Sequence, residues 1–321
     1  KEILDLKYFF KSSTFASLFV CFDIFYQLFN GQDIFGFKPI GRKLSGPFGD
    51  EPIAGGYIQR FSIFAFFLIP FFYPKHLNKF LRLLIPVLFL IFFTGVILSG
   101  NRMPLILYIF SIFLIIIFQK QTRKYLLSFI FIFLTIFFLT YKLVPQFKDN
   151  ARNFYFQVTK ISVMVLEKDF YNKQSPDYLK EFVTFYDTWL MHKYLGGGIK
   201  NFRYYCHHRK DIDINSEFIC NMHPHNYYLE ILTETGLMGF SIIICIFLLT
   251  LYISFFKKYF SKSSLQYNNL IIPFIFLFIV EIFPIKSTGS FFTTGNATYL
   301  FLIMSILIGL ARKYNSIENK S

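Results

Sequence analysis

Long apolar stretches alternate with short polar gaps along this sequence. Eight stretches approach the roughly 20 residues that an α-helix needs to cross the hydrocarbon core of a bilayer. A soluble amphipathic helix would instead show a polar stripe. The stretches are 13–29, 57–73, 83–98, 103–118, 125–143, 237–256, 267–283 and 297–310, and polar residues such as Asp23 and Asn268 interrupt the first and the seventh. We therefore predict an all-α integral membrane protein with a multi-helix transmembrane bundle.

Lysine and arginine gather in alternate gaps. Short cytoplasmic loops of membrane proteins are enriched in these two residues, so we expect the basic gaps to be cytoplasmic. These gaps hold Lys75, Lys79 and Arg82; Lys120, Arg123 and Lys124; Lys257, Lys258 and Lys262; and Arg312 and Lys313. The remaining gaps, 31–56, 99–102, 144–228 and 284–296, are then expected on the periplasmic side, with both ends of the chain in the cytoplasm.

The periplasmic segment 144–228 is too long to be a simple connector. Within it, residues 177–193 carry large apolar side chains at three- and four-residue spacing, namely Tyr178, Phe182, Phe185 and Trp189. This pattern predicts an amphipathic helix on the membrane or on the bundle rather than a direct ligand site. We expect one transmembrane domain, residues 1–321, with one large periplasmic loop that contains short helices.

Composition supports the membrane interpretation. Hydrophobic residues make up 54% of the chain and phenylalanine alone contributes 48 residues, more than a soluble core needs. The net charge of +14 would suggest nucleic acid in a soluble protein. Here the cations lie mainly in the gaps between apolar stretches, so we expect no nucleic-acid partner, and those in the long loop favour an anionic substrate.

The four cysteines divide into two pairs by position. Cys21 and Cys245 lie inside apolar stretches, where they are expected to be inert packing residues. Cys206 and Cys220 both lie in the long loop. A metal site with the histidines after Cys206 is conceivable, but no C-x-x-C accompanies them, and an oxidising compartment favours a disulfide.

No motif in the sequence indicates a cofactor. It contains no phosphate-binding loop, dinucleotide fingerprint or serine nucleophile elbow. Residues 196–198 are a glycine run without a following Lys-Ser/Thr, which predicts a turn. Asp211 and Asp213 have the spacing of a metal–nucleotide motif, but that spacing alone is a weak signal.

Two polar segments lie at the expected membrane boundary. The first is the turn 99–102, where Arg102 either snorkels to the interface or binds phosphate oxygens through its planar guanidinium. The second is 223–230, where His223, His225, Asn226 and Glu230 gather as the long loop re-enters the membrane. Asn226 is also a suitable N-cap for the following helix, and the structural and functional roles are compatible.

Several segments together point to a known family. They are 44–51 with 54–57 (Ala-Gly-Gly-Tyr), 99–102 (Ser-Gly-Asn-Arg), 197–203 (Gly-Gly-Ile-Lys-Asn-Phe-Arg), 223–226 (His-Pro-His-Asn) with 234–239 (Glu-Thr-Gly-Leu-Met-Gly), and 287–292 (Ser-Thr-Gly-Ser-Phe-Phe). From about residue 41 to residue 300, the chain resembles the bacterial O-antigen ligase and O-antigen polymerase family.

The resemblance implies a multi-pass glycosyltransferase of the bacterial inner membrane, acting in lipopolysaccharide biosynthesis for the cell envelope. Such an enzyme takes a glycan from an undecaprenyl (polyprenyl) diphosphate on the periplasmic side and needs no metal, cofactor or nucleotide sugar. Transfer occurs with inversion, to a growing glycan in a polymerase or to a lipid A core in a ligase. Family members carry more helices than are counted here, so the resemblance implies further helices upstream.

The family chemistry assigns roles to particular residues. Arginine stabilises the negative charge that develops on the departing diphosphate, and the candidates are Arg102 first, then Arg203, Arg42 and Arg152. The acceptor hydroxyl needs a base or an orienting acceptor, which suits an imidazole. His225 is the candidate, with His223 and Asn226 as supporting residues.

On the predicted topology Arg102 and His225 lie at the same membrane depth, so we expect them to face one cavity. A lipid-linked glycan transporter or flippase is the main alternative function, and a non-catalytic membrane scaffold is another. The flippase would not need a large loop ending in a His-Asn cluster, and transporters usually show repeated halves, which this sequence lacks. A scaffold would leave the clustered arginine and histidine residues unexplained.

Overall fold

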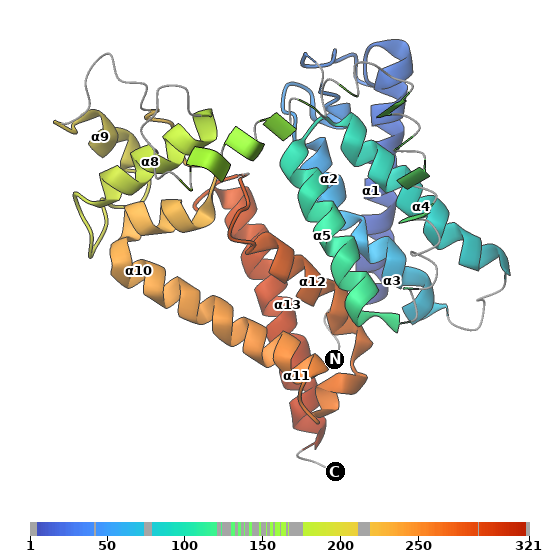
Figure 1. Ribbon diagram of the computed structural model, residues 1–321. Helices are drawn as coiled ribbons and strands as arrows, with labels where there is room; N and C mark the ends of the chain where they lie inside the picture. The colour runs from blue at the N-terminus through green and yellow to red at the C-terminus, as the bar shows by residue number, and fades with distance from the viewer. Residues whose placement is uncertain are drawn as a thin grey trace. The chain divides into compact units, whose positions relative to one another are not determined.

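A computed structural model describes residues 5–41, 43–73, 79–120, 176–210, 219–287 and 289–318, with scattered positions between 123 and 166 (Figure 1). These residues form helices and connecting loops, with no β-strand among them beyond one isolated bridge between Ile40 and Lys43. The prediction of an all-α membrane protein is confirmed. The chain divides into two compact units, Lys1–Phe133 with Lys257–Val280 and Leu310–Ser321, and Leu134–Phe256 with Glu281–Gly309.

Most of the predicted stretches fall on helices. The apolar helices are α1 (Leu6–Asn30), α2 (Ala54–Phe61), α3 (Ile63–Phe72), α4 (Lys79–Leu98), α5 (Arg102–Phe118), α10 (Tyr227–Leu251), α12 (Ile272–Glu281) and α13 (Thr294–Glu318). Only the predicted stretch 125–143 lies mostly outside the described residues. Within the described part, four helical segments are long and apolar enough to cross a membrane: Leu6–Asn30, Ala54–Phe72, Tyr227–Tyr259 and Thr294–Lys313.

Phenylalanine rings form the core of the first unit. Phe10 on α1, Phe64 on α3 and Phe274 on α12 are almost fully buried. The ring centroids of Phe10 and Phe64 are 5.0 Å apart, and those of Phe64 and Phe274 are 5.1 Å apart. Tilted and edge-on aromatic pairs at this distance are favourable contacts, so the abundant phenylalanine serves packing between helices as well as contact with lipid.

Polar residues on α1 hold the loop that follows it. The Asp23 carboxylate accepts a hydrogen bond from the Ile34 backbone N–H at 2.8 Å. The Gln27 amide donates to the Phe37 carbonyl at 3.1 Å and accepts from the Gly46 N–H at 3.1 Å. Both side chains are buried and find hydrogen-bond partners in this loop, which explains polar residues inside an apolar stretch.

The turn before α5 packs against the start of α2. Gly55 lies so close to the Ser99 hydroxyl that a Cβ on Gly55 would overlap it. The Asn101 amide donates to the Pro52 carbonyl at 2.7 Å. Two of the predicted periplasmic gaps, 31–56 and 99–102, therefore meet at one end of the first unit, as the predicted alternation of gaps requires.

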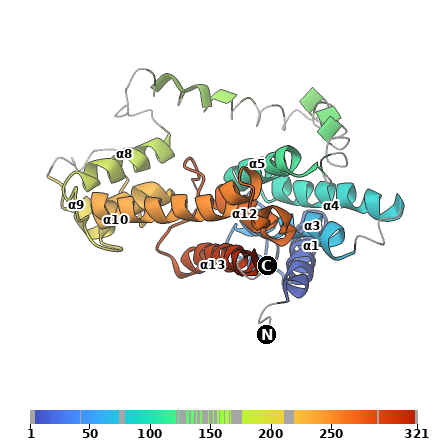
Figure 2. The same ribbon diagram turned by 90° about the horizontal axis from the view of Figure 1, so that it is seen from below.

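The second unit joins α10 to the short helices of the long loop, α8 (Asp177–Trp189) and α9 (Phe202–His207). Buried Phe185 of α8 stacks on Phe202 of α9, and the Phe185 carbonyl accepts a hydrogen bond from the Thr233 hydroxyl of α10 at 3.2 Å. α8 lies alongside the first part of α10 (Figure 2). The predicted helix 177–193 ends at Trp189, because the chain turns there and the Trp189 indole N–H donates to the Lys193 carbonyl at 3.0 Å.

A buried arginine and a disulfide fasten α9 in this unit. The Arg209 guanidinium donates to the Thr184 carbonyl at 3.1 Å and lies 3.5 Å from the Asp187 carboxylate. Cys206 and Cys220, the pair expected to form a disulfide, are bonded to each other, with 5.7 Å between their Cα atoms. A bonded Cys206 has no thiolate to offer a metal, which removes the alternative site with the neighbouring histidines.

α10 bends sharply at Gly236, as Figure 1 shows. We call Tyr227–Thr235 the first arm of α10 and Leu237–Leu251 its second arm. The backbone of Gly236 has φ 65° and ψ −171°, so the helical hydrogen bonds are broken there. The glycine turn 196–198 lies against the break, and a Cβ on Gly196 or Gly236 would overlap the backbone of the opposite segment.

The glycine turn and the residues before it replace the hydrogen bonds that the bend removes. The N–H groups of Gly197 and Gly198 donate to the carbonyls of Thr233 and Glu234 at 3.0 and 2.9 Å. The Leu237 N–H donates to the Lys193 carbonyl at 2.9 Å. Buried backbone groups need such partners, so the turn and the bend depend on each other.

We expect Gly236→Ala to destabilise the protein. The conformation of Gly236 is essentially restricted to glycine and costs another residue about 1–3 kcal/mol, before any overlap of the new Cβ is counted. Thermal unfolding in detergent micelles measures the loss. Gly309→Ala in α13 is the control, because its Cβ meets open space and alanine favours a helix interior by about 1 kcal/mol over glycine. Equal effects of the two substitutions would contradict the role assigned to the bend.

Candidate active site

His225 lies two residues before the first residue of α10, in an unusual backbone conformation. Its φ is 52°, a left-handed value that few non-glycine residues adopt. Its ring packs against His223 with the centroids 4.4 Å apart, and Pro224 between them is buried. Because such strain persists only where the surroundings impose it, and collects at functional sites, His225 is a candidate for chemistry.

Burial changes the pKa of both imidazoles. It lowers the pKa of His225 below its ordinary value, since burial disfavours the charged ring. Burial also lowers the pKa of His223, and the charge of His225 lowers it further. His225 is therefore neutral near pH 7, the form that accepts a proton from a hydroxyl group.

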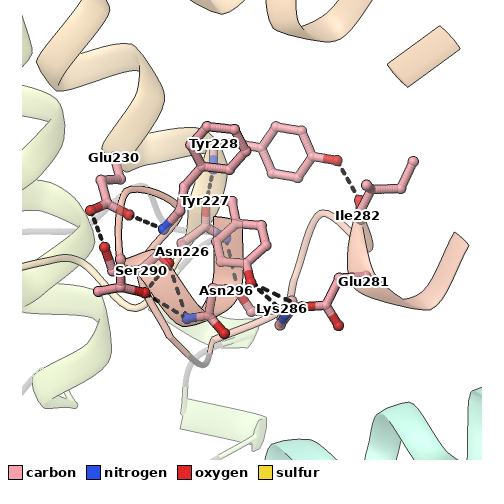
Figure 3. Close-up of polar contacts among 11 residues, drawn as sticks. Asn226, Tyr227, Tyr228, Glu230, Glu281, Ile282, Lys286, Ser290 and Asn296 are labelled. Carbon is pink, nitrogen blue, oxygen red and sulfur yellow. Dashed lines mark hydrogen bonds and ion pairs between the residues drawn. The ribbon is translucent and has the colours of Figure 1, made fainter. Parts of the chain in front are cut away.

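Asn226 fixes the start of α10 in two ways at once (Figure 3). Its side-chain oxygen accepts hydrogen bonds from the N–H groups of Tyr228 and Leu229 at 3.0 and 3.1 Å, which is the predicted N-cap. Its amide nitrogen donates to the carbonyls of Pro284 and Lys286 at 2.8 and 3.2 Å. The residue that follows His225 therefore ties the long loop to the segment between α12 and α13.

Glu230, one turn further along α10, makes a second connection to that segment. Its buried carboxylate accepts hydrogen bonds from the Ser290 hydroxyl and the Phe291 N–H. The Asn296 amide donates to the Ser290 carbonyl at 3.0 Å and holds the same turn (Figure 3). The predicted periplasmic gaps 144–228 and 284–296 thus meet at one end of the second unit.

A buried cation completes this network. The Lys286 ammonium pairs with the Glu281 carboxylate, donates to the Tyr227 hydroxyl at 3.0 Å and lies 4.2 Å from the centre of the Tyr227 ring. All three residues are buried, so each polar group depends on the others for compensation. Removing one partner would leave a charge uncompensated beside the start of α10.

The glycine turn brings two cations to the second acidic residue of α10. The Glu234 carboxylate accepts a hydrogen bond from the Lys200 N–H, and the charges of Lys200 and Arg203 act on it. Glu234 is buried, and its Oε2 atom has no hydrogen-bond partner among the described residues. Lys200 and Arg203 are themselves exposed.

The polar segment 223–230 already contained Asn226 and Glu230, and the sequence carried a further signal for Glu234. Asn226, Glu230 and Glu234 recur at four-residue spacing, which places them on one face of the first arm of α10. No sequence pattern indicated that Lys286 and Glu281 form a buried pair, because their common partner Tyr227 lies in a distant part of the chain.

The predicted arginines have different places in the structure. Arg102 is the exposed first residue of α5, in the first unit, whereas His225 belongs to the second unit. Their placement in one cavity stays a prediction. Arg203 is exposed on α9 and Arg152 is also exposed, while Arg42 lies outside the described residues.

Comparison with known families gives an independent result. Residues 87–244 match a family model described as O-antigen ligase. The matched range contains α5, α8, α9 and most of α10, and with them Arg102, Arg203 and His225. It does not extend to the family-like segments at 44–57 and 287–292. A search of curated proteins found no match.

We expect Asn226→Asp to disrupt the junction. Aspartate caps a helix as well as asparagine does, so a residue acting only as an N-cap would tolerate the change. Here the substitution removes the two hydrogen bonds to the Pro284 and Lys286 carbonyls and places a carboxylate next to them. Each buried group left unpaired lowers the free energy of unfolding by about 1–3 kcal/mol. Thermal unfolding in micelles should show a loss for Asn226→Asp comparable to that for Asn226→Ala. Wild-type stability of Asn226→Asp would mean that the cap is the whole role of Asn226.

Proposed function

We propose that this chain, whose residues 87–244 match the O-antigen ligase family, transfers a glycan from a polyprenyl diphosphate to an acceptor hydroxyl at the periplasmic face of the bacterial inner membrane. The observation that carries the proposal is the neutral, half-buried imidazole of His225 at the start of α10, with the cationic turn around Lys200 and Arg203 hydrogen-bonded to the first arm of the same helix.

The proposed reaction is a direct displacement at the anomeric carbon with inversion. The acceptor oxygen forms a bond to that carbon, and the bond from the carbon to the diphosphate oxygen breaks. His225 takes the proton of the acceptor hydroxyl. The electron pair leaves with the polyprenyl diphosphate, whose oxygens gain negative charge, and no metal is required.

The cations of the glycine turn suit the leaving group. Arg203 presents a planar set of donors that matches phosphate oxygens, and Lys200 adds a second positive charge. The buried Glu234 carboxylate accepts from the Lys200 backbone, which supports its role in fixing the turn. Donors held in place before the reaction stabilise developing charge without reorganising.

Arg102 is proposed as a further diphosphate ligand, with Arg152 and Arg42 as weaker candidates. The support for Arg102 is its place in the Ser-Gly-Asn-Arg turn at the start of α5 and inside the matched family range. The acceptor is either a growing glycan or a lipid A core. No finding favours the flippase alternative.

We expect His225→Ala and Arg203→Ala each to lower glycan transfer on the order of a hundredfold or more at normal protein levels. Arg203→Lys should be impaired as well, because it keeps the charge but loses the planar fork. Complementation of ligase-null and polymerase-null bacteria, with surface polysaccharide separated on gels, measures transfer. It also identifies the acceptor, since the wild-type chain should restore only one background.

His207→Ala and Arg312→Ala are matched controls. His207 is an exposed histidine on α9, and Arg312 is an exposed arginine on α13, in a gap predicted to be cytoplasmic. Both variants should retain full transfer. Near-normal transfer by His225→Ala and Arg203→Ala would refute the assignment of the site.

The pH dependence of transfer should follow His225. A base must be neutral to accept a proton, and burial lowers the pKa of His225 below 6.5. Transfer should therefore be constant near pH 7 and fall only as the pH drops through the lowered pKa. Initial rates in proteoliposomes between about pH 5 and pH 8 test this. An acid limb centred above pH 6.5 would contradict a buried imidazole as the base.

A further inference from the structure

The loop between α8 and α9 exposes a group of large apolar side chains. Met191, Tyr194, Leu195 and Ile199 are 44%, 71%, 73% and 58% exposed. We call these four residues the apolar ridge. Scattered apolar residues are normal on a protein surface, but four within nine positions of one loop mark an interaction site.

The ridge is held in place by the bend of α10. The carbonyls of Lys193 and Tyr194 accept hydrogen bonds from the N–H groups of Leu237 and Met238 at 2.9 and 3.1 Å. The Trp189 indole donates to the Lys193 carbonyl from the other side. With its backbone fixed at both points, the ridge is a preformed surface.

The ridge continues the outer face of the second arm of α10. Leu237 and Met238, bonded to the ridge, are 45% and 58% exposed. The arm belongs to the segment Tyr227–Tyr259, which is apolar enough to cross a membrane. The exposed apolar residues along it are Ile242, Ile246, Leu248 and Leu249. In Figure 1 the loop that carries the ridge lies beside the bend, where the second arm begins.

Cations accompany the ridge at the same turn. Lys193 and Lys200 are exposed, and each is next to a ridge residue in sequence. Long cationic side chains beside exposed aromatic and aliphatic groups are typical of segments that lie in the headgroup region of a bilayer. The lysines suit the phosphates of lipid headgroups, and the apolar side chains suit the acyl chains below them.

We propose that the apolar ridge inserts into the bilayer leaflet at which the second arm of α10 begins, so that the α8–α9 loop is a membrane anchor. The occupant is the lipid bilayer because the ridge is continuous, through backbone hydrogen bonds, with a helix that is long and apolar enough to cross a membrane and largely exposed. Anionic lipids strengthen the insertion through Lys193. The anchor does not depend on the chemistry proposed for His225 and Arg203.

Tryptophan fluorescence provides the test, since Trp189 is the only tryptophan of the chain. In a Trp189→Phe background, Tyr194→Trp places the probe on the ridge. Tyr204→Trp is the matched control. Tyr204 is 58% exposed and belongs to α9, which lies above the loop of the ridge in Figure 1. Proteoliposomes made with brominated phospholipids quench tryptophans that contact acyl chains. The Cys206–Cys220 disulfide, verified by non-reducing mass spectrometry, reports a correct fold.

We expect severalfold stronger quenching for Tyr194→Trp than for Tyr204→Trp. Equal, weak quenching at both positions would overturn the proposal. So would protection of the Tyr194→Trp probe from both bromolipid and aqueous iodide, because this would mean that a second copy of the chain covers the ridge. In the unmodified protein, a membrane-partitioning carbene reagent should label residues 190–199 in the same liposomes. Absence of that label would overturn the anchor without any substitution.

Discussion

Backbone hydrogen bonding at the bend of α10 is the constraint on which the second unit depends. A helix that breaks beside a bilayer leaves N–H and carbonyl groups that lipid cannot satisfy. The glycine turn and the residues before it supply the missing partners from a segment that precedes α9. Gly196 and Gly236 meet there, and neither position has room for a Cβ. This contact between the glycine turn and the bend positions α9, the cations Lys200 and Arg203, and the apolar ridge, because all of them adjoin the turn in sequence.

The first arm of α10 is organised by polar contacts as well as by apolar packing. Asn226 and Glu230 bind backbone groups of the segment between α12 and α13, and Glu234 binds the Lys200 backbone in the glycine turn. Each contact is a donor–acceptor pair that is expensive to leave unmade in a buried site, so the three residues specify one arrangement of loops. This places a strained histidine reproducibly at the end of a helix whose other arm belongs to a segment apolar enough to cross a membrane.

Hydrophobic length made the helices predictable, since a bilayer imposes a minimum number of apolar residues. The cap at Asn226 and the pairing of Cys206 with Cys220 depend on residue type and local context, and both occur in the structure. The bend at Gly236 was not predicted, because it depends on Gly196, which lies 40 positions away. The Lys286–Glu281 pair was not predicted either, because the shared partner Tyr227 lies 54 and 59 positions from Glu281 and Lys286 in sequence.

Because of the break at Gly236, the two arms of α10 differ in how they tolerate an inserted residue. An inserted residue in the first arm would rotate every later position by about 100°, turning Glu234 away from the loop that it binds. An insertion in the second arm rotates only surfaces that face lipid or packing partners, and it leaves His225 and the three polar anchors where they are. The length of the span is therefore free to follow bilayer thickness during evolution, while the spacing of the site is not.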